Sequence, residues 1–389
     1  MIRNILTPFT LSCILTICCS CTKEPFTNIK SKYTTESLLI QKDGLINCLD
    51  TTEYSIKIEA NLSVPDSSII LDCNRLKFDE GHYYLQTEGK NMTIWVFDSV
   101  GNFVSKLGER GRAKNEYQTD ITDWFRVSDS DEIVVFERNS RKVHTFSIHE
   151  NKSSAFILES WPNSIGVLNK GKLFCSYYHK EAKEGLQLAL LTNNEDIKSD
   201  FMYLGQNMAF VPSDLCFYKI ADRLFHVPSF ADSAIVFRAD TVEKIVRFNF
   251  EDTFISEDIK QEAYKDHLER LRCFEGIKYI ESYYETSKYD VIKFVYNKFV
   301  INHLIDKTDG RQFRFSSALP MGIFPSTVFC VRDNKIYYVI TKENVEETRT
   351  ILTPKVYESE LTKSSNVIKD IFNNKVSLPV IVSIEINHQ

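Results

Sequence analysis

The stretch HYYLQTEGKNMTIWVFDSVGN, residues 82–102, decides the fold of this chain. It holds two apolar, aromatic runs, residues 82–85 and 93–97, which are joined by the polar turn 88–91. A second polar turn, which contains Gly101, follows the second run. Short runs of this composition, bounded by turn residues, predict two adjacent strands of one antiparallel sheet.

The same unit recurs along the chain. Further copies pair residues 132–136 with 142–146, 172–175 with 186–191, and 223–227 with 233–237. Steps of 49, 45 and 46 residues separate the last apolar residues of the second runs, which are Phe97, Phe146, Leu191 and Phe237. A period near 45 residues with no helix inside it is the length of one four-stranded propeller blade.

The next copy ends at Ile305, which is 68 residues after Phe237. The excess corresponds to residues 256–273, SEDIKQEAYKDHLERLRC, which are rich in helix formers and contain neither glycine nor proline. We therefore predict one inserted helix near 256–273. A last copy pairs residues 328–331 with 335–340, and residues 359–372 predict a short helix or an irregular cap.

Residues 53–58 and 380–386 alternate like strands at the two ends, and each needs a partner. Pairing them in one blade would close a ring and remove open sheet edges. The predicted fold is therefore all-β, a six-bladed β-propeller in residues 51–389 that is closed by N- and C-terminal strands. The rival fold is a pair of β-sandwiches, which does not predict a period that continues past residue 200.

The first residues predict export and anchoring. Arg3 precedes the apolar residues 5–17, and small residues precede Cys21. This apolar stretch is too short for a transmembrane helix, which needs about 20 residues. Residues 1–20 therefore predict a lipoprotein signal peptide, with Cys21 as the residue that receives lipid, including acyl chains such as palmitate. The alternative is an ordinary secretory signal with incidental cysteines.

Residues 21–50 are polar and weakly patterned, which predicts a tether between membrane and propeller. Lys23 and Glu24 resemble the short charged signal that sends lipoproteins of Bacteroides-type bacteria to the cell surface; a solvated tether is the alternative. The net charge of −6 at pH 7 argues against general nucleic-acid binding. After residue 20 there is no CxxC, no Cys/His cluster and no HExxH, GxSxG or Walker motif, so the sequence predicts no metal and no cofactor.

Residues 106–117 form the candidate ligand-binding loop. Four cations lie within nine residues, namely Lys106, Arg110, Arg112 and Lys114. A connection between blades crosses one face of a propeller, so Arg110 and Arg112 could hold a carboxylate or phosphate by forked hydrogen bonds. The predicted ligand-binding residues are Arg110, Arg112, Lys114, Glu116 and Tyr117. The alternative is a structural loop, in which the arginines pair with Glu109, Glu116 and Asp120 while Tyr117 packs in the core.

From about residue 69 onwards the chain resembles the six-bladed β-propeller lipoproteins of gut Bacteroides, distant relatives of the NHL-repeat propellers. Residues 94–103 and 107–117 are similar to the family pattern I-x-V-F-D-x-x-G-x-F followed by G-x-x-G-x-G-P-x-E-Y. The chain keeps Gly108, Gly111, Glu116 and Tyr117, and it has residues 113–115, AKN, where Gly-Pro-Gly is usual. The resemblance implies the fold and an outer-membrane lipoprotein, on the cell surface or the periplasmic face, while the biochemical role of the family is mostly unassigned.

Two classes of function remain open. The first is a non-enzymatic binding or scaffold propeller for a glycan, a peptide or an envelope protein. The second is a propeller enzyme of the lyase or lactonase type, with a metal in the central channel. A metal site needs acidic or histidine ligands from several blades, and equivalent blade positions do not repeat such residues, which favours the binding class. Tryptophans could stack on a sugar ring or pack in the core, and these are Trp95, Trp124 and Trp161.

Overall fold

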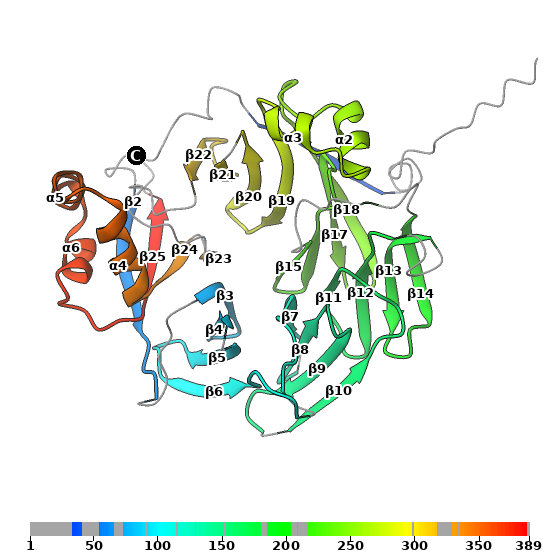
Figure 1. The fold of residues 1–389 in the computed structure, drawn as a ribbon, viewed down its shortest axis with the longest axis horizontal. Coiled ribbons are helices and arrows are strands. Elements are labelled where there is room, and N and C mark those ends of the chain that lie inside the picture. Colours follow the sequence, from blue (N-terminus) through cyan, green and yellow to red (C-terminus); the bar gives the residue numbers. More distant parts are fainter. Residues whose placement is uncertain are drawn as a thin grey trace, which may run out of the picture.

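The computed structural model describes residues 33–40, 54–65, 73–89, 92–113, 116–128, 130–150, 152–179, 185–203, 208, 216–297, 299–316, 329–332 and 335–386. The predicted signal peptide, Cys21 and Lys114 lie outside these residues. Within the described residues, the strands form six sheets that surround a common axis like the blades of a propeller (Figure 1). The predicted six-bladed β-propeller is confirmed.

Each blade is an antiparallel sheet whose first strand lies innermost. The first blade contains β3 (Cys73–Asp79), β4 (His82–Thr87), β5 (Thr93–Asp98) and β6 (Phe103–Leu107). The second contains β7 (Asp123–Arg126), β8 (Glu132–Glu137), β9 (Lys142–Ser147) and β10 (Ser153–Ile157). The third contains β11 (Ser164–Gly166), β12 (Lys172–Ser176), β13 (Leu186–Thr192) and β14 (Ile197–Tyr203).

The remaining blades include strands from both ends of the described chain. The fourth contains β15 (Phe217–Ile220), β16 (Arg223–His226), β17 (Ser233–Arg238) and β18 (Thr241–Asn249). The fifth contains β19 (Ile277–Glu285), β20 (Tyr289–Tyr296), β21 (Phe299–Asp306) and β22 (Gln312–Ser316). The sixth contains β23 (Phe329–Arg332), β24 (Lys335–Ile340), β25 (Val380–Ile386) and β2 (Tyr54–Asn61).

The sixth blade closes the ring. Ile384 of β25 lies opposite Ile336 of β24 on one side and opposite Ile56 of β2 on the other. Because β2 comes from the N-terminal part and β25 from the C-terminal part, the two ends of the propeller share one sheet. The predicted closure by both ends is confirmed, and it leaves no gap between the first and last blades.

The hydrophobic core lies between neighbouring blades. Trp95 and Phe97 of the first blade, for example, pack in one cluster with Val339 and Ile381 of the sixth. The two middle strands of a blade are therefore buried on both faces, which explains their continuous apolar runs. The outermost strands, such as β10, are partly exposed and carry a mixed sequence.

The predicted helix near 256–273 is broken into two, α2 (Glu257–Tyr264) and α3 (Glu269–Cys273). The chain reverses between them at Asp266, which adopts the left-handed conformation with φ 64°. This reversal lets Arg270 of α3 bind Asp258 and Glu262 of α2, at 2.6 and 2.8 Å. Two antiparallel short helices thus replace the single helix that the sequence indicated.

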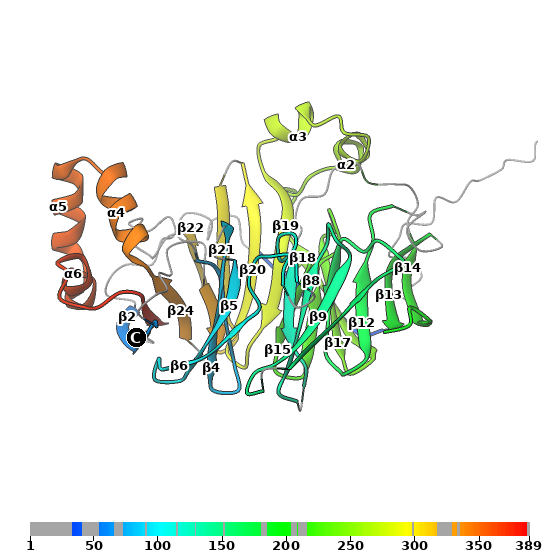
Figure 2. The same ribbon diagram turned by 60° about the horizontal axis from the view of Figure 1, so that its bottom comes forward.

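A second insertion separates β24 from β25. It comprises α4 (Lys342–Ile351), α5 (Pro354–Lys363) and α6 (Asn366–Phe372), where the sequence indicated only a cap over 359–372. Ile368 and Phe372 are buried against the sixth blade. Figure 2 shows α2–α3 and α4–α6 projecting from the same side of the ring. None of the helices in the described part of the chain has the length and apolar composition that a membrane crossing needs.

One strand lies inside the predicted tether. β1 (Thr35–Leu39) pairs in parallel with β18 as a fifth strand of the fourth blade. Lys244 of β18 binds Glu36 at 2.6 Å, and the Gln312 side chain of the fifth blade donates to the carbonyl of Leu39 at 2.9 Å. The prediction of a tether over 21–50 is therefore wrong for residues 35–39, which hold two blades together.

Candidate functional site

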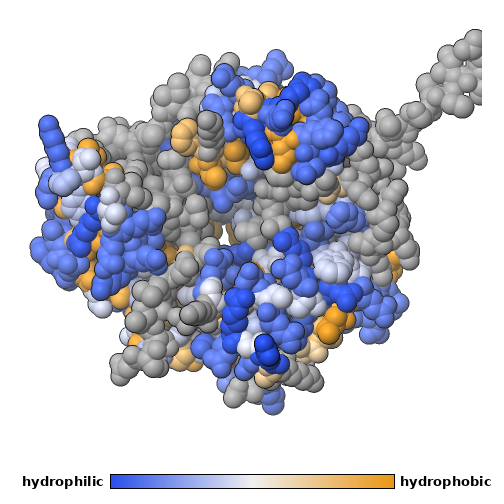
Figure 3. Space-filling view, in the orientation of Figure 1, coloured by the Kyte–Doolittle hydropathy of each residue, from blue (hydrophilic) through white to orange (hydrophobic). Residues whose placement is uncertain are grey.

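The inner strands surround a cavity of about 630 Å³ near the axis of the ring. Its walls come from β3, β7, β15, β19 and β23, which belong to five different blades. The space-filling view shows that the molecule is hollowed at this centre (Figure 3). Most lining residues lie in the later parts of these strands and in the turns after them, so the cavity lies toward the face where the inner strands end. A volume of this size is typical of small-molecule sites.

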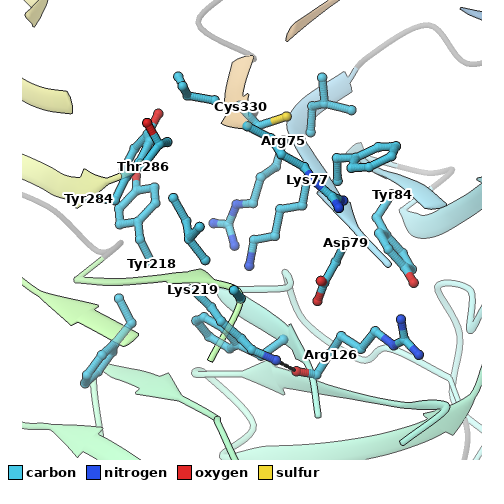
Figure 4. A pocket seen from close by; sticks show the side chains of 18 of the residues that line it. Arg75, Lys77, Asp79, Tyr84, Arg126, Tyr218, Lys219, Tyr284, Thr286 and Cys330 are labelled. Atoms are coloured by element: carbon cyan, nitrogen blue, oxygen red, sulfur yellow. Dashed lines mark hydrogen bonds between the residues drawn. The ribbon is translucent and has the colours of Figure 1, made fainter. Parts of the chain in front are cut away.

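The alternation of β3 directs charged side chains into the cavity. Arg75, Lys77 and Asp79 alternate with Leu76 and Phe78, and successive side chains of a strand point to opposite faces. Leu76 is buried in the core between the first and sixth blades. Figure 4 shows the side chains of Arg75, Lys77 and Asp79 extending from β3 into the space between the inner strands.

Three cations of the cavity bind the main chain along β7 and the residue before it. Arg75 Nη2 donates to the carbonyl of Thr122 at 2.9 Å, and Lys77 Nζ donates to the carbonyl of Trp124. Lys219 of β15 donates from the opposite wall to the carbonyl of Arg126, a bond drawn in Figure 4. Because these acceptors are two residues apart, their carbonyls lie on the same edge of the strand. The three cations therefore follow one another along the inner edge of the second blade.

Burial and like charges act together on Lys77. Burial, followed by repulsion from Arg75 and Lys219, lowers the pKa of Lys77 well below its ordinary value, although Asp123 opposes this shift. Asp123 lies beneath the cations, where burial raises its pKa to about 6 against the attraction of Arg75. Its carboxylate accepts a hydrogen bond of 2.7 Å from Ser164 and lies 3.9 Å from Arg75.

Other charges of the cavity wall are paired with acids or packed on rings. Arg126 binds Glu80 and also lies 3.5 Å from Asp131. Lys293 binds the carboxylate of Glu281 at 2.7 Å. The guanidinium of Arg332 lies 4.4 Å from the ring centroid of Phe78. The aromatic flank also includes Tyr218 and Tyr284, whose rings stack with centroids 5.6 Å apart.

The predicted loop, residues 106–117, connects β6 to β7 at the face where the inner strands begin. Tyr117 is fully buried and donates to the carbonyl of Leu107 at 2.6 Å. A Cβ at Gly108 would lie 2.7 Å from the Tyr117 ring, and one at Gly111 would lie 1.9 Å from the Glu116 carboxylate. Both glycines are therefore required by close packing. The tyrosine is a core residue, so the prediction that Tyr117 contacts a ligand is wrong.

The charged side chains of this loop have different surroundings. Glu116 accepts the amide of Ala113 at 2.7 Å and so fixes the loop. Arg110 lies 3.2 Å from Asp120 and donates to the carbonyl of Gly89, as the structural alternative expected. Arg112 is exposed, and with Arg110 it lines a shallow surface depression.

Comparison with protein families gives one match. Residues 59–337 match the model of the family DUF5128, described as a 6-bladed beta-propeller. The chain belongs to this family. No curated protein matches it. The family match covers the first five blades and most of the sixth, which agrees with the observed architecture.

Two solved structures from Bacteroides are similar to this DUF5128 chain. The first is a Bacteroides fragilis protein described as exported, with 15% identity and a TM-score of 0.69, covering 91% of this chain and 100% of that one. The second is a DUF4221-family member from Bacteroides vulgatus, with 12% identity and a TM-score of 0.49, covering 86% and 99%. At these identities the first comparison shows a shared fold.

The sequence reasoning missed the cavity residues because it followed the middle strands of each blade. Arg75 and Lys77 lie in β3, and Lys219 lies in β15, which are short inner strands that the repeat analysis did not mark. A signal was present, since charged residues alternate with apolar ones before the first clear repeat. Trp95 and Trp124 are buried, as the core alternative expected, whereas Trp161 is half exposed beside Arg141.

Proposed function

We propose that this chain is an envelope-anchored lipoprotein whose propeller binds a glycan, a peptide or a partner protein without catalysis. The observation that carries this proposal is the central cavity, which combines cations from several blades with aromatic walls. Guanidinium and ammonium groups bind and orient a ligand by charge-assisted hydrogen bonds. The rigid ring holds these groups in place, which reduces the ordering cost of binding.

The alternative is an enzyme of the lyase or lactonase type with a metal in the channel. Among the described residues, no group of three or more His, Cys, Asp and Glu side chains is arranged to hold a metal ion. The cavity wall instead carries mostly cations, which attract anions and repel a divalent metal. This set of side chains supports binding over metal-assisted catalysis.

We further propose that Cys21 carries the lipid and places the protein at the outer membrane, on the cell surface or the periplasmic face. The signal sequence supports this, and so does the similar Bacteroides fragilis protein that is described as exported. The chain between Cys21 and β1 can span at most roughly 50 Å, since an extended residue covers about 3.5 Å. The fourth blade, which carries β1, would therefore stay near the membrane.

Replacing Cys21 with serine tests the anchor. We expect the Cys21→Ser variant to lose its acyl mass and to leave the membrane fraction. Replacement of Cys19 by serine is the matched control, since it leaves the acceptor thiol in place and should change neither property. Retention of both membrane association and acylated mass in Cys21→Ser would contradict the proposed anchor.

The binding function is tested by following ligand mass as well as ligand retention. Full-length protein in detergent is incubated with panels of oligosaccharides and peptides, and retained molecules are weighed before and after incubation. We expect retention with unchanged ligand mass. Conversion of a panel member to product would instead support the enzyme alternative.

A second surface has its own support. Arg112 is exposed at a shallow depression that Arg110 also lines, on a chain that is acidic overall. We propose that these arginines, with Lys114 and Glu116 next to them in sequence, contact an anionic group of a larger partner. The partial engagement of Arg110 by Asp120 limits what this contact contributes.

A further inference from the structure

We propose that the central cavity is an anion site that takes a carboxylate or phosphate group, carried by a small ligand or by the end of a chain. The groups assigned to the anion are Arg75, Lys77 and Lys219. This inference names the ligand class for the binding function proposed above and rests on that function.

The first support is the balance of charge in one enclosed place. The cavity is lined by the cations Arg75, Lys77, Arg126, Lys219, Lys293 and Arg332. Three acids, Asp79, Glu80 and Asp222, lie in the same wall. The whole chain has a net charge of −6, so this excess of cations is a local departure from the composition of the protein.

The second support is the kind of acceptor that the three assigned cations use. Arg126 and Lys293 bind carboxylates, which neutralise their charge locally. Arg75, Lys77 and Lys219 donate to main-chain carbonyls instead. A carbonyl carries no net charge, and an ammonium has three donors while a guanidinium has five. These bonds orient the three cations and leave both charge and donor capacity for an anion.

The third support is electrostatic. The lowered pKa of Lys77 reports burial and the repulsion of Arg75 and Lys219, so these like charges are close enough to disfavour one another. An anion placed among them would remove that repulsion and favour the charged form of Lys77. The free energy released in this way would contribute to binding, because it is gained only when the anion is present.

The apolar walls restrict the body of the ligand. The stacked rings of Tyr218 and Tyr284 lie on one side, and the ring of Phe78 lies in β3. A cavity of about 630 Å³ accepts a sugar or a few residues of a peptide but excludes a folded domain. The site thus fits an acidic group attached to a compact body with one apolar face.

Titration calorimetry on the full-length protein in detergent tests the site with three probes. Glucuronate and glucose form a matched pair that differs in one carboxylate, and inorganic phosphate tests the other oxyanion. We expect glucuronate or phosphate to bind at least about tenfold more tightly than glucose, and added sodium chloride to weaken that binding. The better of the two anions identifies which oxyanion the cavity accepts.

Variants then place the bound anion. Lys77→Gln and Lys219→Gln should each weaken the preferred anion by about tenfold or more, since one charge-assisted bond is lost. Lys152→Gln is the matched control at an exposed lysine and should leave affinity unchanged. Melting curves accompany each variant, and Lys77→Arg, which keeps the charge, should retain most of the binding if Lys77→Gln is unstable.

Two results would overturn the inference. One is an affinity for glucuronate and phosphate no greater than that for glucose. The other is anion binding that folded Lys77→Gln and Lys219→Gln variants share with the wild type, since the anion would then sit elsewhere. Retention of neutral oligosaccharides or uncharged peptides would still support the broader binding function, so the two proposals can fail separately.

Discussion

The loop 106–117 and the central cavity both gather cations, but they do so in different ways. In the loop, four cations lie within nine residues of sequence. Of the described ones, Lys106 binds Glu109 and Arg110 binds Asp120, each next to its own acid. In the cavity, Arg75, Lys77 and Lys219 come from separate blades and converge on carbonyls of the second blade.

This difference shows that charge density along a sequence is a poor guide to charge density in space. Neighbouring charges in a loop tend to be offset by local acids and by water, so their net effect is small. Charges brought together by the fold lie in a less polar place, where their mutual effects on pKa are larger. The cavity therefore depends on the whole ring, whereas the loop depends on a few contacts around Tyr117.

Opening the ring should have the largest effect. Deletion of residues 380–386 removes β25, which pairs with both β24 and β2. The loss of this central strand should exceed the total stability of a domain, which is about 5–15 kcal/mol. We expect cooperative unfolding and loss of the cavity, measured by near-ultraviolet circular dichroism and thermal melting.

A terminal deletion of residues 387–389 is the control, since it spares β25. If the protein without residues 380–386 kept its melting temperature and its cavity ligand, closure by the C-terminal strand would not be needed for the ring.

Truncation of Tyr117 should have the next largest effect. Tyr117→Ala removes a buried ring that packs on Gly108, and similar truncations cost about 3–5 kcal/mol. Tyr117→Phe removes only the hydrogen bond to Leu107, which contributes about 1 kcal/mol. Urea denaturation measures both changes. Unchanged stability in Tyr117→Ala, combined with weaker ligand binding, would return this residue to the functional surface.

The pH dependence of anion affinity distinguishes the cavity by the titration of Lys77. Four charged groups act on it, Arg75 and Asp79 of β3, Asp123 of β7 and Lys219 of β15. An anion prefers the charged form, so affinity should be full below the lowered pKa of Lys77 and should fall as pH rises through it. We expect the affinity for glucuronate to drop about tenfold or more between about pH 6 and about pH 10.

The Lys77→Arg variant provides the comparison, because a guanidinium stays charged over this range. Its affinity should change less with pH than that of the wild type. Equal pH dependence in the two proteins would show that another group controls the binding.

The loop should give the smallest effect. Arg110→Ala with Arg112→Ala removes one exposed ion pair, which is worth about 0–1 kcal/mol. We expect nearly unchanged melting, unchanged glucuronate affinity and weaker retention of polygalacturonate, a large polyanion. Lower melting without any change in retention would instead assign both arginines to a structural clamp.

Much of the fold could be predicted because the middle strands of each blade are buried on both faces. Phe97, Phe146, Leu191 and Phe237 all end third strands, and this shared position produces the regular period. The inner strands were missed because β11 has only three residues and β7 and β15 only four, which is too short for a clear pattern. The three helices of the second insertion also displaced the third strand of the sixth blade.

The candidate site was less predictable because it depends on convergence. Lys77 and Lys219 lie in different blades, and only the ring places both beside the second blade. Nothing in the spacing of these residues marks that meeting. The loop motif was visible, but its retained residues Gly108, Gly111, Glu116 and Tyr117 are explained by packing and loop geometry.

A diffraction measurement with selenate tests the central claim most directly, because this tetrahedral dianion resembles phosphate and its selenium scatters anomalously. Crystals of the full-length protein are soaked in selenate, and the anomalous difference map is searched over the whole ring. We predict a peak within hydrogen-bond distance of Lys77 and Lys219, which is lost in the Lys77→Gln variant. A peak beside Arg112 with none in the central cavity would contradict the account.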